Sequence, residues 1–245
     1  MNKILSIKNL NYTYKTGRYS VPALIDLTFD VAEGEIFGFI GPNGAGKTTT
    51  IKILLNILEI QKGEVLLSGK FPSRTDSREE IGYMPEIANY YWYLTPRELL
   101  NMYGRIFGID KITLKTKVPV LLNLVGLENA GDRIMRTFSK GMMQKISFAQ
   151  ALINDPKLLI LDEPMGGLDP VSRKKMRDVI LELRSQGKTI FFSSHELSEV
   201  ELISDRIGIL NNGSLLAVAS TKNLLTNKGT SQSLEHYFLD IITNK

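Results

Sequence analysis

The residues with the clearest chemical meaning form one short glycine-rich segment, Gly41-Pro42-Asn43-Gly44-Ala45-Gly46-Lys47-Thr48. It matches the pattern G-x-x-x-x-G-K-[ST], in which successive backbone N–H groups converge on phosphate oxygens. Glycine lets the backbone curl this tightly, and the start of a following helix adds a favourable positive potential. Lys47 supplies a charge for the β- and γ-phosphates of a nucleotide, and the Thr48 hydroxyl can ligate Mg²⁺. The segment therefore predicts a phosphate-binding loop rather than a glycine-rich turn that binds nothing.

Two acidic residues that directly follow an apolar run form a second candidate centre. Asp162 and Glu163 come after Leu158–Leu161, a run of the kind that is buried in parallel sheets. Ligands of open α/β sheets bind at the carboxyl ends of strands, so Asp162 can hold Mg²⁺ and Glu163 can orient or deprotonate an attacking water. The alternative is a solvated loop whose acids merely end a strand, and the phosphate loop earlier in the chain argues against it.

The segments around the phosphate loop alternate between strand and helix patterns. Glu35–Ile40 indicates a buried strand that runs into the loop, and Thr189–Phe192 indicates another buried strand later in the chain. The first 35 residues have the alternation of β structure. Four apolar residues at helical spacing predict a helix after the loop: Ile51, Leu54, Leu55 and Leu58.

The middle of the chain changes to helical signals. Thr95-Pro96-Arg97-Glu98 predicts a helix start, with Thr95 as N-cap, Pro96 at the first helical position and Glu98 closing a capping box. Residues 141–153 predict another helix, stopped by Asp155-Pro156. An amphipathic helix is expected over residues 171–186. Helices inserted into a strand–loop–helix ATPase core summarise this pattern most simply.

The composition excludes several classes of protein. The 245 residues include no cysteine, which excludes a disulfide framework, thiolate metal sites and a cysteine nucleophile. The net charge of +4 is too small to imply a nucleic-acid partner, and none is expected. No apolar stretch approaches the length of a membrane span, and the start lacks a signal-peptide core. A soluble, cytosolic domain is expected, so any membrane role must come through a partner.

These motifs together resemble the nucleotide-binding subunit of an ATP-binding cassette (ABC) transporter, over nearly the whole chain. Five further features match this family in the expected order. They are the adenine-stacking aromatic at Tyr14, the loop joining core and helical subdomain at Ile81–Glu86, the signature motif at Phe138–Met142, the D-loop at Gly166–Asp169 and the switch histidine at His195.

The resemblance implies an α/β fold: a RecA-like P-loop NTPase core with an N-terminal antiparallel β region and an inserted helical subdomain. The whole chain, 1–245, would be one ABC domain. Its ATPase core would comprise about 1–86 and 155–225, its helical subdomain about 87–154 and its C-terminal extension 226–245. ATP and Mg²⁺ are the implied cofactors, and ATP hydrolysis coupled to transport is the implied reaction.

The resemblance also assigns roles to residues. Lys47, Glu163 and His195 would be catalytic, and Thr48, Asp162 and Glu86 would hold Mg²⁺. The nucleotide would be bound by these residues together with Tyr14, Gly41, Pro42, Asn43, Gly44, Ala45, Gly46, Thr49, Ser139, Gly141 and Asp169. Ser139 and Gly141 would act across a head-to-tail dimer, each facing the nucleotide held by the other subunit.

Two departures from the family pattern point to one of its branches. The signature motif has Phe138, Lys140 and Met142 where Leu, Gly and Gln are commonest, and Glu86 stands where Gln is usual. Together with the short C-terminal region that contains Ser233–Leu239, they resemble exporters of the ABC-2 type, whose membrane subunits are separately encoded. The expected partners are a polytopic membrane permease and a second ABC subunit, identical or different, at the inner face of the cell membrane. A non-transport ABC ATPase in DNA repair or translation is the alternative, and a P-loop kinase or GTPase would leave the signature and His195 unexplained.

Some of these residues also have purely structural explanations. Ser139 and Asp169 stand where helix N-caps are expected, which is compatible with a role in binding. Tyr14 has Tyr12 nearby, and either ring could belong to the core.

His195 is one of two histidines, and a lone histidine is more often a surface or structurally satisfied residue. Ser193 and Glu196 predict a capping box for the helix that follows it, which favours a phosphate contact at His195.

Four consecutive aromatic residues, Tyr90–Tyr93, form an unusual run. Alternation cannot bury all four on one face, so the run is either part of the helical-subdomain core or, in part, the lining of a groove for a membrane subunit.

Overall fold

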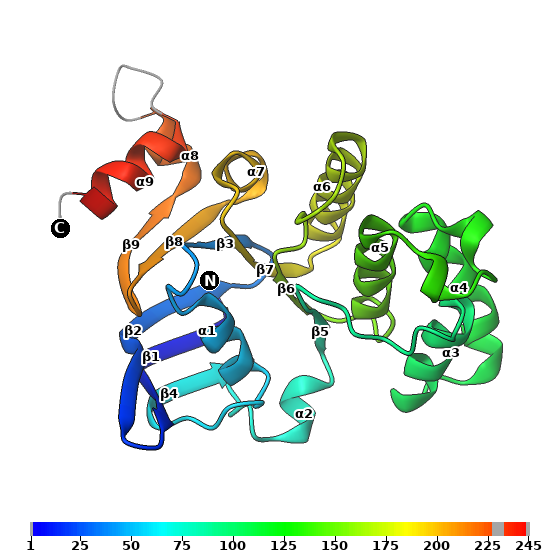
Figure 1. Cartoon of the computed structure of the whole chain (residues 1–245), viewed down its shortest axis with the longest axis horizontal. Helices are drawn as coiled ribbons and strands as arrows, with labels where there is room; N and C mark the ends of the chain where they lie inside the picture. The colour runs from blue at the N-terminus through cyan, green and yellow to red at the C-terminus, as the bar shows by residue number, and fades with distance from the viewer. Residues whose placement is uncertain (1, 227–232, 244–245) are drawn as a thin grey trace. The chain divides into compact units, whose positions relative to one another are not determined.

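The computed structural model describes residues 2–226 and 233–243. The chain divides into two compact units. The first consists of residues 1–78 and 189–245, and the second of residues 79–188. Each is described by itself below, with the element labels of Figure 1.

The first unit contains an antiparallel sheet with the strand order β2-β1-β4. Its strands are β1 (Lys3–Thr16), β2 (Tyr19–Ala32) and β4 (Lys62–Leu67). The register pairs Ile7 with Phe29 and also with Val65, so the inward-facing residues of all three strands are apolar. This sheet is the antiparallel β region that the sequence predicts at the N-terminus.

Parallel strands in the first unit carry the phosphate loop. Strand β3 (Ile36–Ile40) is fully buried and pairs in parallel with β7 (Thr189–Ser194) on one side and β8 (Arg206–Asn211) on the other. Strand β9 (Ser214–Ser220) continues antiparallel to β8. The strands predicted at Glu35–Ile40 and Thr189–Phe192 are confirmed as β3 and β7.

Aromatic packing joins the two sheets of the first unit. The ring of Phe29 from β2 stacks on Phe37 and Phe39 from β3, with centroids 5.3 Å apart in both pairs. Phe191 from β7 lies 5.3 Å from Phe39. Stacked rings of this kind contribute about 0.5–1.5 kcal/mol per pair beyond their buried area, so the strand that precedes the phosphate loop has a rigid support.

Five helices complete the described part of the first unit: α1 (Lys47–Leu54), α2 (Thr75–Arg78), α7 (Leu197–Ile203), α8 (Thr221–Thr226) and α9 (Leu234–Thr243). Helix α9 lies beside α7 and α8 (Figure 1). The predicted helix after the loop forms, but it ends at Leu54 instead of reaching Leu58. Asn56 has a φ of 56°, a left-handed conformation that does not continue an α-helix.

The capping box predicted at Ser193 and Glu196 is wrong. Ser193 is the fifth residue of β7, and α7 begins only after Glu196, which caps the helix without a side-chain hydrogen bond. The Ser194 hydroxyl instead accepts a hydrogen bond from the Glu196 N–H at 2.9 Å. Ser193 cannot cap the helix because it lies within β7, which runs two residues further than the sequence pattern indicates.

The second unit combines two parallel strands with helices. Strands β5 (Ile81–Met84) and β6 (Leu158–Asp162) pair in parallel. The helices are α3 (Pro96–Ile106), α4 (Lys111–Leu124), α5 (Lys140–Ala151) and α6 (Pro170–Ser185), with 3-10 turns at Glu128–Ala130 and Met135–Thr137. The predicted helix start at Thr95–Glu98 and the predicted helices over residues 141–153 and 171–186 are therefore confirmed, with boundaries that differ by no more than two residues.

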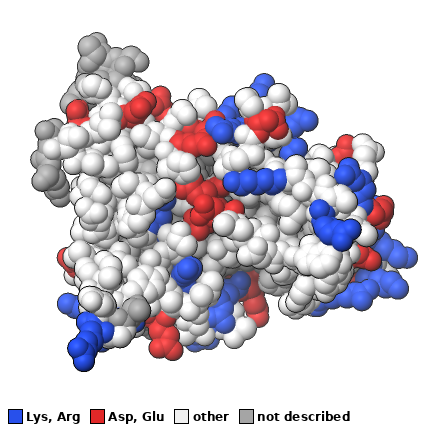
Figure 2. Space-filling model, in the orientation of Figure 1, with Lys and Arg blue, Asp and Glu red and all other residues white. Residues whose placement is uncertain are grey.

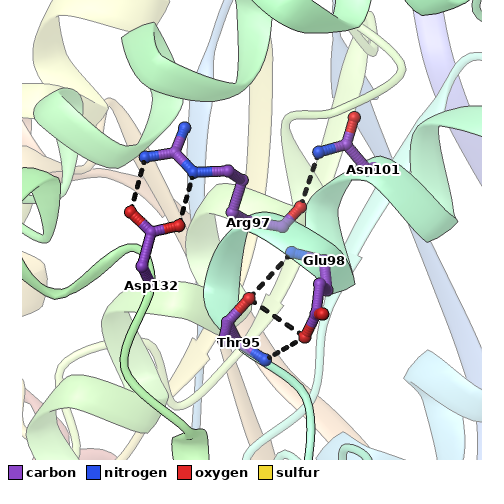
Figure 3. Close-up of polar contacts among 5 residues, drawn as sticks. All are labelled: Thr95, Arg97, Glu98, Asn101 and Asp132. Atoms are coloured by element: carbon purple, nitrogen blue, oxygen red, sulfur yellow. Dashed lines mark hydrogen bonds and ion pairs between the residues drawn. The ribbon is translucent and has the colours of Figure 1, made fainter.

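The capping box predicted at the start of α3 is confirmed. The Thr95 hydroxyl accepts from the Glu98 N–H at 3.2 Å, and the Glu98 carboxylate accepts from the Thr95 N–H at 2.9 Å (Figure 3). The same picture shows Arg97, the next residue of this turn, paired with Asp132 through both carboxylate oxygens, at 2.9 and 3.2 Å. These contacts fix the start of α3 and tie it to the loop that follows the first 3-10 turn. Among the described helices, none is long and apolar enough to cross a membrane.

Candidate functional site

The phosphate loop of the first unit depends on glycine at two positions where a side chain has no room. Gly46, the residue before α1, has a φ of 112°, and a Cβ there would lie 2.7 Å from the Ala23 carbonyl oxygen. A Cβ on Gly41 would collide with the Leu210 carbonyl oxygen. Close approach of the backbone on both sides is what gives the loop its curl, as the sequence pattern predicts.

Lys47 places its ammonium group against this loop. The residue is only 7% exposed, and Nζ donates to the carbonyl oxygens of Gly41 at 2.7 Å and Pro42 at 3.3 Å. A buried cation beside the N-terminus of α1 makes a strong local positive potential. The loop can therefore bind a polyphosphate.

Tyr14, to which the family resemblance assigns adenine stacking, lies beside the loop. Its hydroxyl is 3.3 Å from Oγ1 of Thr49, in the first turn of α1. The ring meets Tyr12 edge-on with centroids 5.0 Å apart, and the residue remains 37% exposed. A partly exposed ring next to the loop leaves an aromatic surface available for stacking.

His195 lies at the same sheet edge as the loop. The register of β3 and β7 pairs Ile40, the residue before Gly41, with Ser194, the residue before His195. Both strands run in parallel, so their carboxyl ends meet at one edge. The His195 side chain is exposed there.

The carboxylates of the second unit lie at the end of β6. Asp162 is 2% exposed and Glu163 is 8% exposed. Parallel pairing of Met84 with Leu161 brings the residues after β5, including Glu86, to the same edge. Glu163 has a φ of 51°, a left-handed conformation that is rare for a residue with a long side chain.

The pKa of Tyr83, a residue of β5, is shifted by the acidic groups at this edge. Burial, together with the negative charges of Asp162 and Glu86, raises the pKa of the Tyr83 hydroxyl to about 12. The carboxylates of Asp162 and Glu86 therefore both lie close enough to the Tyr83 hydroxyl to affect its pKa. Oxygen donors of this type suit Mg²⁺, which is held by one or two carboxylates together with phosphate oxygens and water. Among residues 2–226 and 233–243, no group of three acidic, histidine or cysteine residues forms a complete metal site without such additional ligands.

The signature segment of the second unit starts helix α5. Ser139 is its N-cap, and the exposed hydroxyl accepts from the Met142 N–H at 3.3 Å. A Cβ on Gly141 would meet only ordinary contacts, 3.6 Å from Leu168 and 3.9 Å from the Gly167 carbonyl oxygen. The fold of this subunit does not itself require glycine at position 141.

Asp169 caps α6, as one of its two expected roles. Its Oδ1 accepts from the N–H groups of Val171 and Ser172, both at 3.0 Å. The side-chain and backbone hydrogen bonds from Ser172 lower the pKa of the Asp169 carboxyl.

One contact was not predicted from the sequence. Gln144, buried at 3% exposure, donates from Nε2 to the Glu163 carbonyl oxygen at 3.0 Å. The available signal was its position, since Gln144-Lys145 directly continues the signature motif.

The predicted site residues are divided between the two units. Tyr14, the loop residues 41–49 and His195 belong to the first unit. Glu86, Ser139, Gly141, Asp162, Glu163 and Asp169 belong to the second.

A comparison with protein-family models matches residues 24–166 to the family described as "ABC transporter". An ABC transporter ATP-binding protein of Nostoc sp. is 44% identical over 232 residues, covering 93% of this chain and 69% of that protein. The chain belongs to the ABC transporter family. An ABC transporter ATP-binding protein of Synechocystis sp. is 45% identical over 219 residues, covering 87% of this chain and 62% of that protein. The chain thus spans about two thirds of the length of these curated relatives.

A solved structure described as the ATP-binding subunit of an ABC transporter has a TM-score of 0.87 at 30% identity, covering 98% of this chain and 99% of that one. A cassette described as dimeric and bound to ADP and Pi has the same fold, with a TM-score of 0.81 at 24% identity over 89% of this chain and 98% of that one. The P-loop NTPase fold is therefore confirmed, together with the role of an ATP-binding, ATP-hydrolysing subunit of an ABC transporter. The non-transport alternative is not favoured. ABC cassettes form dimers and work with membrane subunits of transporters.

Proposed function

We propose that this subunit hydrolyses ATP, with Mg²⁺, to drive export of a solute through a separate polytopic membrane subunit at the inner face of the cell membrane. Three relatives support a transport role by their names, and two of these names specify export. A fluoroquinolone export ATP-binding protein of Mycobacterium tuberculosis is 36% identical over 225 residues, a bacitracin transport ATP-binding protein of Bacillus licheniformis 42% over 193, and a Nod factor export ATP-binding protein of Burkholderia pseudomallei 36% over 224.

The observation that carries the proposed reaction is the buried Lys47 ammonium, held at 2.7 Å from the Gly41 carbonyl at the start of α1. A preorganised cation and loop N–H groups stabilise the charge that develops on transferred phosphoryl oxygens. Glu163 would accept a proton from the attacking water, and His195 would donate a hydrogen bond to the γ-phosphate. Thr48, Asp162 and Glu86 would hold Mg²⁺, and the ion would supply neutralising charge at the phosphates.

The environment of Gly141 supports a nucleotide shared between two subunits. Within one subunit an alanine would fit at this position, so the glycine leaves space for a group from outside. The exposed Ser139 hydroxyl lies at the N-terminus of α5, where backbone N–H groups favour an anion. We infer that both face the γ-phosphate bound by a second ABC subunit, so that ATP closes a head-to-tail dimer.

Exposed aromatic side chains support a docking surface for the membrane subunit. Tyr91, Trp92 and Tyr93 are 54%, 57% and 57% exposed. Tyr90, in contrast, is half-buried, and its hydroxyl donates to Ser147 at 3.1 Å and to Gln150 at 3.0 Å. The run is therefore held to α5 by its first residue and presents the other three rings, which are favoured anchors at protein interfaces.

The backbone of this aromatic segment is also fixed. The Arg136 N–H donates to the Trp92 carbonyl oxygen at 2.8 Å, and the Arg136 guanidinium lies 5.8 Å from the centre of the Trp92 ring. The Met135 N–H donates to the Leu94 carbonyl oxygen at 2.9 Å. A rigid aromatic surface loses little side-chain entropy when a partner binds.

A basic groove lies on the neighbouring helices α3 and α4 and is the second element of this docking surface. Its volume is about 730 Å³, and its lining includes Met102 and the 70% exposed Ile106. The cations Arg105, Lys111 and Lys115 line it, and in the described part of the chain none of them has an ion pair. Lys and Arg side chains gather over α3 and α4 in Figure 2. Charge complementarity therefore favours an acidic, amphipathic segment of the membrane subunit.

The proposed reaction is tested by variants of single catalytic groups. Lys47→Ala should abolish hydrolysis and weaken nucleotide binding. Glu163→Gln should retain ATP binding but reduce turnover by roughly 10²–10⁴-fold, the usual contribution of a general base. Normal turnover of Glu163→Gln would show that another group is the base.

The shared nucleotide is tested by mixing subunits. Ser139→Ala and Lys47→Ala subunits should each be inactive alone, because one lacks the trans contact and the other the phosphate cation. Mixed together they should regain activity, since a heterodimer contains one site with both groups intact. Absence of any recovery, in mixtures shown by sedimentation to form heterodimers, would contradict a shared site.

The docking surface is tested by Trp92→Ala, which should weaken co-purification with the membrane subunit while ATP binding is unchanged. The matched control is Tyr19→Ala, since Tyr19 is an aromatic residue of the first unit that is 78% exposed. Equal co-purification of wild type and Trp92→Ala would exclude this surface.

A further inference from the structure

The backbone of Glu163 is held in an unfavourable conformation by contacts from two directions. Its φ of 51° lies in the left-handed region, which residues with a Cβ rarely adopt. Its carbonyl oxygen accepts from the Gly166 N–H at 3.1 Å, which closes a turn after β6. The same oxygen accepts from the Gln144 side chain at 3.0 Å. A conformation of this kind persists only where the surrounding structure imposes it.

Of the two groups that hold the Glu163 carbonyl oxygen, the Gln144 amide comes from outside the turn that Gly166 closes. It lies on α5, 19 residues away along the sequence, and it is buried at 3% exposure. A buried amide group with this geometry makes a strong, directional contact because water does not compete for it. Its target is the backbone of the residue whose carboxylate we assign to water activation.

The start of α5 also packs against the loop that follows Glu163, at a place separate from the Gln144 contact. A Cβ on Gly167 would lie 2.8 Å from the Lys140 side chain, and a Cβ on Gly141 would lie 3.6 Å from Leu168. The first turn of α5 and the loop that follows Glu163 are therefore in contact, one helical turn from Gln144. A shift at the start of α5 would be transmitted to the Glu163 carbonyl.

We propose that Gln144 is a positioning residue for Glu163: its amide fixes the Glu163 carbonyl and thereby directs the Glu163 carboxylate toward the attacking water. This rests on the proposed role of Glu163 as general base. The contact also links the two functions of one subunit, because Ser139 and Gly141 on α5 face the nucleotide of the other subunit while Glu163 acts on its own. Gln144 would then align the base only when α5 occupies the position seen here.

The test is Gln144→Met, which keeps the side-chain length but removes the donor. Because Glu163 retains its carboxyl group and the phosphate loop is untouched, we expect kcat to fall about 10-fold with an unchanged KM and an unchanged affinity for ATP. An unchanged kcat would overturn the proposal. A fall in ATP affinity equal to the fall in kcat would also overturn it, since the residue would then act on binding.

A double-mutant comparison separates positioning from general damage. In a Glu163→Gln background, measured by single-turnover hydrolysis of radiolabelled ATP, Gln144→Met should cause no further loss, because the group it positions is already gone. A second full 10-fold loss would mean that the two residues act independently. The proposed function fails separately, since it fails if Glu163→Gln alone has normal turnover.

Two further variants keep the test decisive if Gln144→Met does not fold. Gly166→Ala would place a Cβ 3.3 Å from the Glu163 carbonyl oxygen and should lower kcat in the same direction by perturbing that group from the other side. Asn154→Leu is the matched control, because the Asn154 amide also donates to backbone carbonyls, at 2.9 Å to Glu79 and 3.0 Å to Ile81, away from Glu163. Normal kcat in Gly166→Ala, or an equal loss in Asn154→Leu, would refute the positioning role.

Discussion

Replacing Gly141 with alanine should separate the stability of the subunit from its activity. The nearest atoms to an added methyl group would be Leu168 Cδ2 at 3.6 Å and the Gly167 carbonyl oxygen at 3.9 Å, both ordinary contact distances. The position lies in the first turn of α5, where alanine is preferred over glycine by up to about 1 kcal/mol. The free energy of unfolding should therefore be unchanged or higher by up to about 1 kcal/mol.

The same methyl group should block hydrolysis. If Gly141 faces the γ-phosphate bound by a second subunit, the added carbon occupies the space of a phosphate oxygen or of its hydrogen bond. We expect kcat to fall at least about 10-fold, which corresponds to about 1.4 kcal/mol of lost transition-state stabilisation. ATP binding to the isolated subunit should remain normal, because the phosphate loop is unaltered.

The assays are thermal unfolding followed by circular dichroism, steady-state ATPase activity, and ATP-dependent dimerisation measured by sedimentation in a Glu163→Gln background. Gly104→Ala provides the opposite case, because a Cβ on Gly104 would collide with Leu114 of α4. Overpacking of this kind costs about 1–3 kcal/mol, so Gly104→Ala should lose stability but keep its specific activity below its unfolding temperature. Wild-type kcat and ATP-dependent dimerisation in Gly141→Ala would refute the inference that position 141 faces a shared nucleotide.

Two other outcomes test contacts within the second unit. Thr95→Ala removes the hydroxyl that caps α3 and should lower stability by about 1 kcal/mol, a decrease of about 2–4 °C in Tm, whereas Thr116→Ala on the exposed side of α4 should have little effect. Lys188→Met removes the ion pair with Asp155, in which Nζ lies 2.6 Å from Oδ1 and lowers the pKa of that carboxyl from its ordinary 3.8. A lowered carboxyl pKa adds stability that is present above 3.8 and is lost as the pH falls through the lower folded-state pKa. Unfolding midpoints of wild type and Lys188→Met should therefore differ at pH 7 and converge below 3.8, and a constant difference would show that the lysine acts through packing alone.

Local signals in the sequence predicted the elements that carry the site. The phosphate loop, the strand before it and the capping box at Thr95 follow from residue types within one turn or one strand. The end of α1 did not follow from periodicity, because Leu58 continues the apolar spacing while Asn56 adopts a left-handed conformation that ends the helix. The capping box at Ser193 was wrong for a similar reason, since pairing with β3 extends β7 through Ser194.

Long-range contacts decided what local patterns left open. Alternation could not assign the aromatic run to core or surface, because the answer depends on Ser147 and Gln150, which hold Tyr90 from 57 and 60 residues away. The bond from Gln144 to Glu163 was likewise invisible, since it requires α5 to pack beside the end of β6. Short-range chemistry can be predicted from a sequence alone, whereas contacts of this range depend on the packing of whole elements.

The conformation of Glu163 distinguishes it from every other left-handed residue with a side chain in the described part of the chain. Five of the seven such residues are Asn or Asp, whose short polar side chains tolerate this region: Asn9, Asp26, Asn56, Asp155 and Asn212. The sixth, Ser68, lies in a tight turn in which the flanking residues Leu67 and Lys70 exchange backbone hydrogen bonds at 2.7 and 2.9 Å. Glu163 alone combines a long side chain with this conformation, at a cost of about 1–3 kcal/mol. Because two hydrogen bonds converge on its carbonyl, the backbone that carries its carboxylate is constrained, which is what the proposed activation of one water molecule requires.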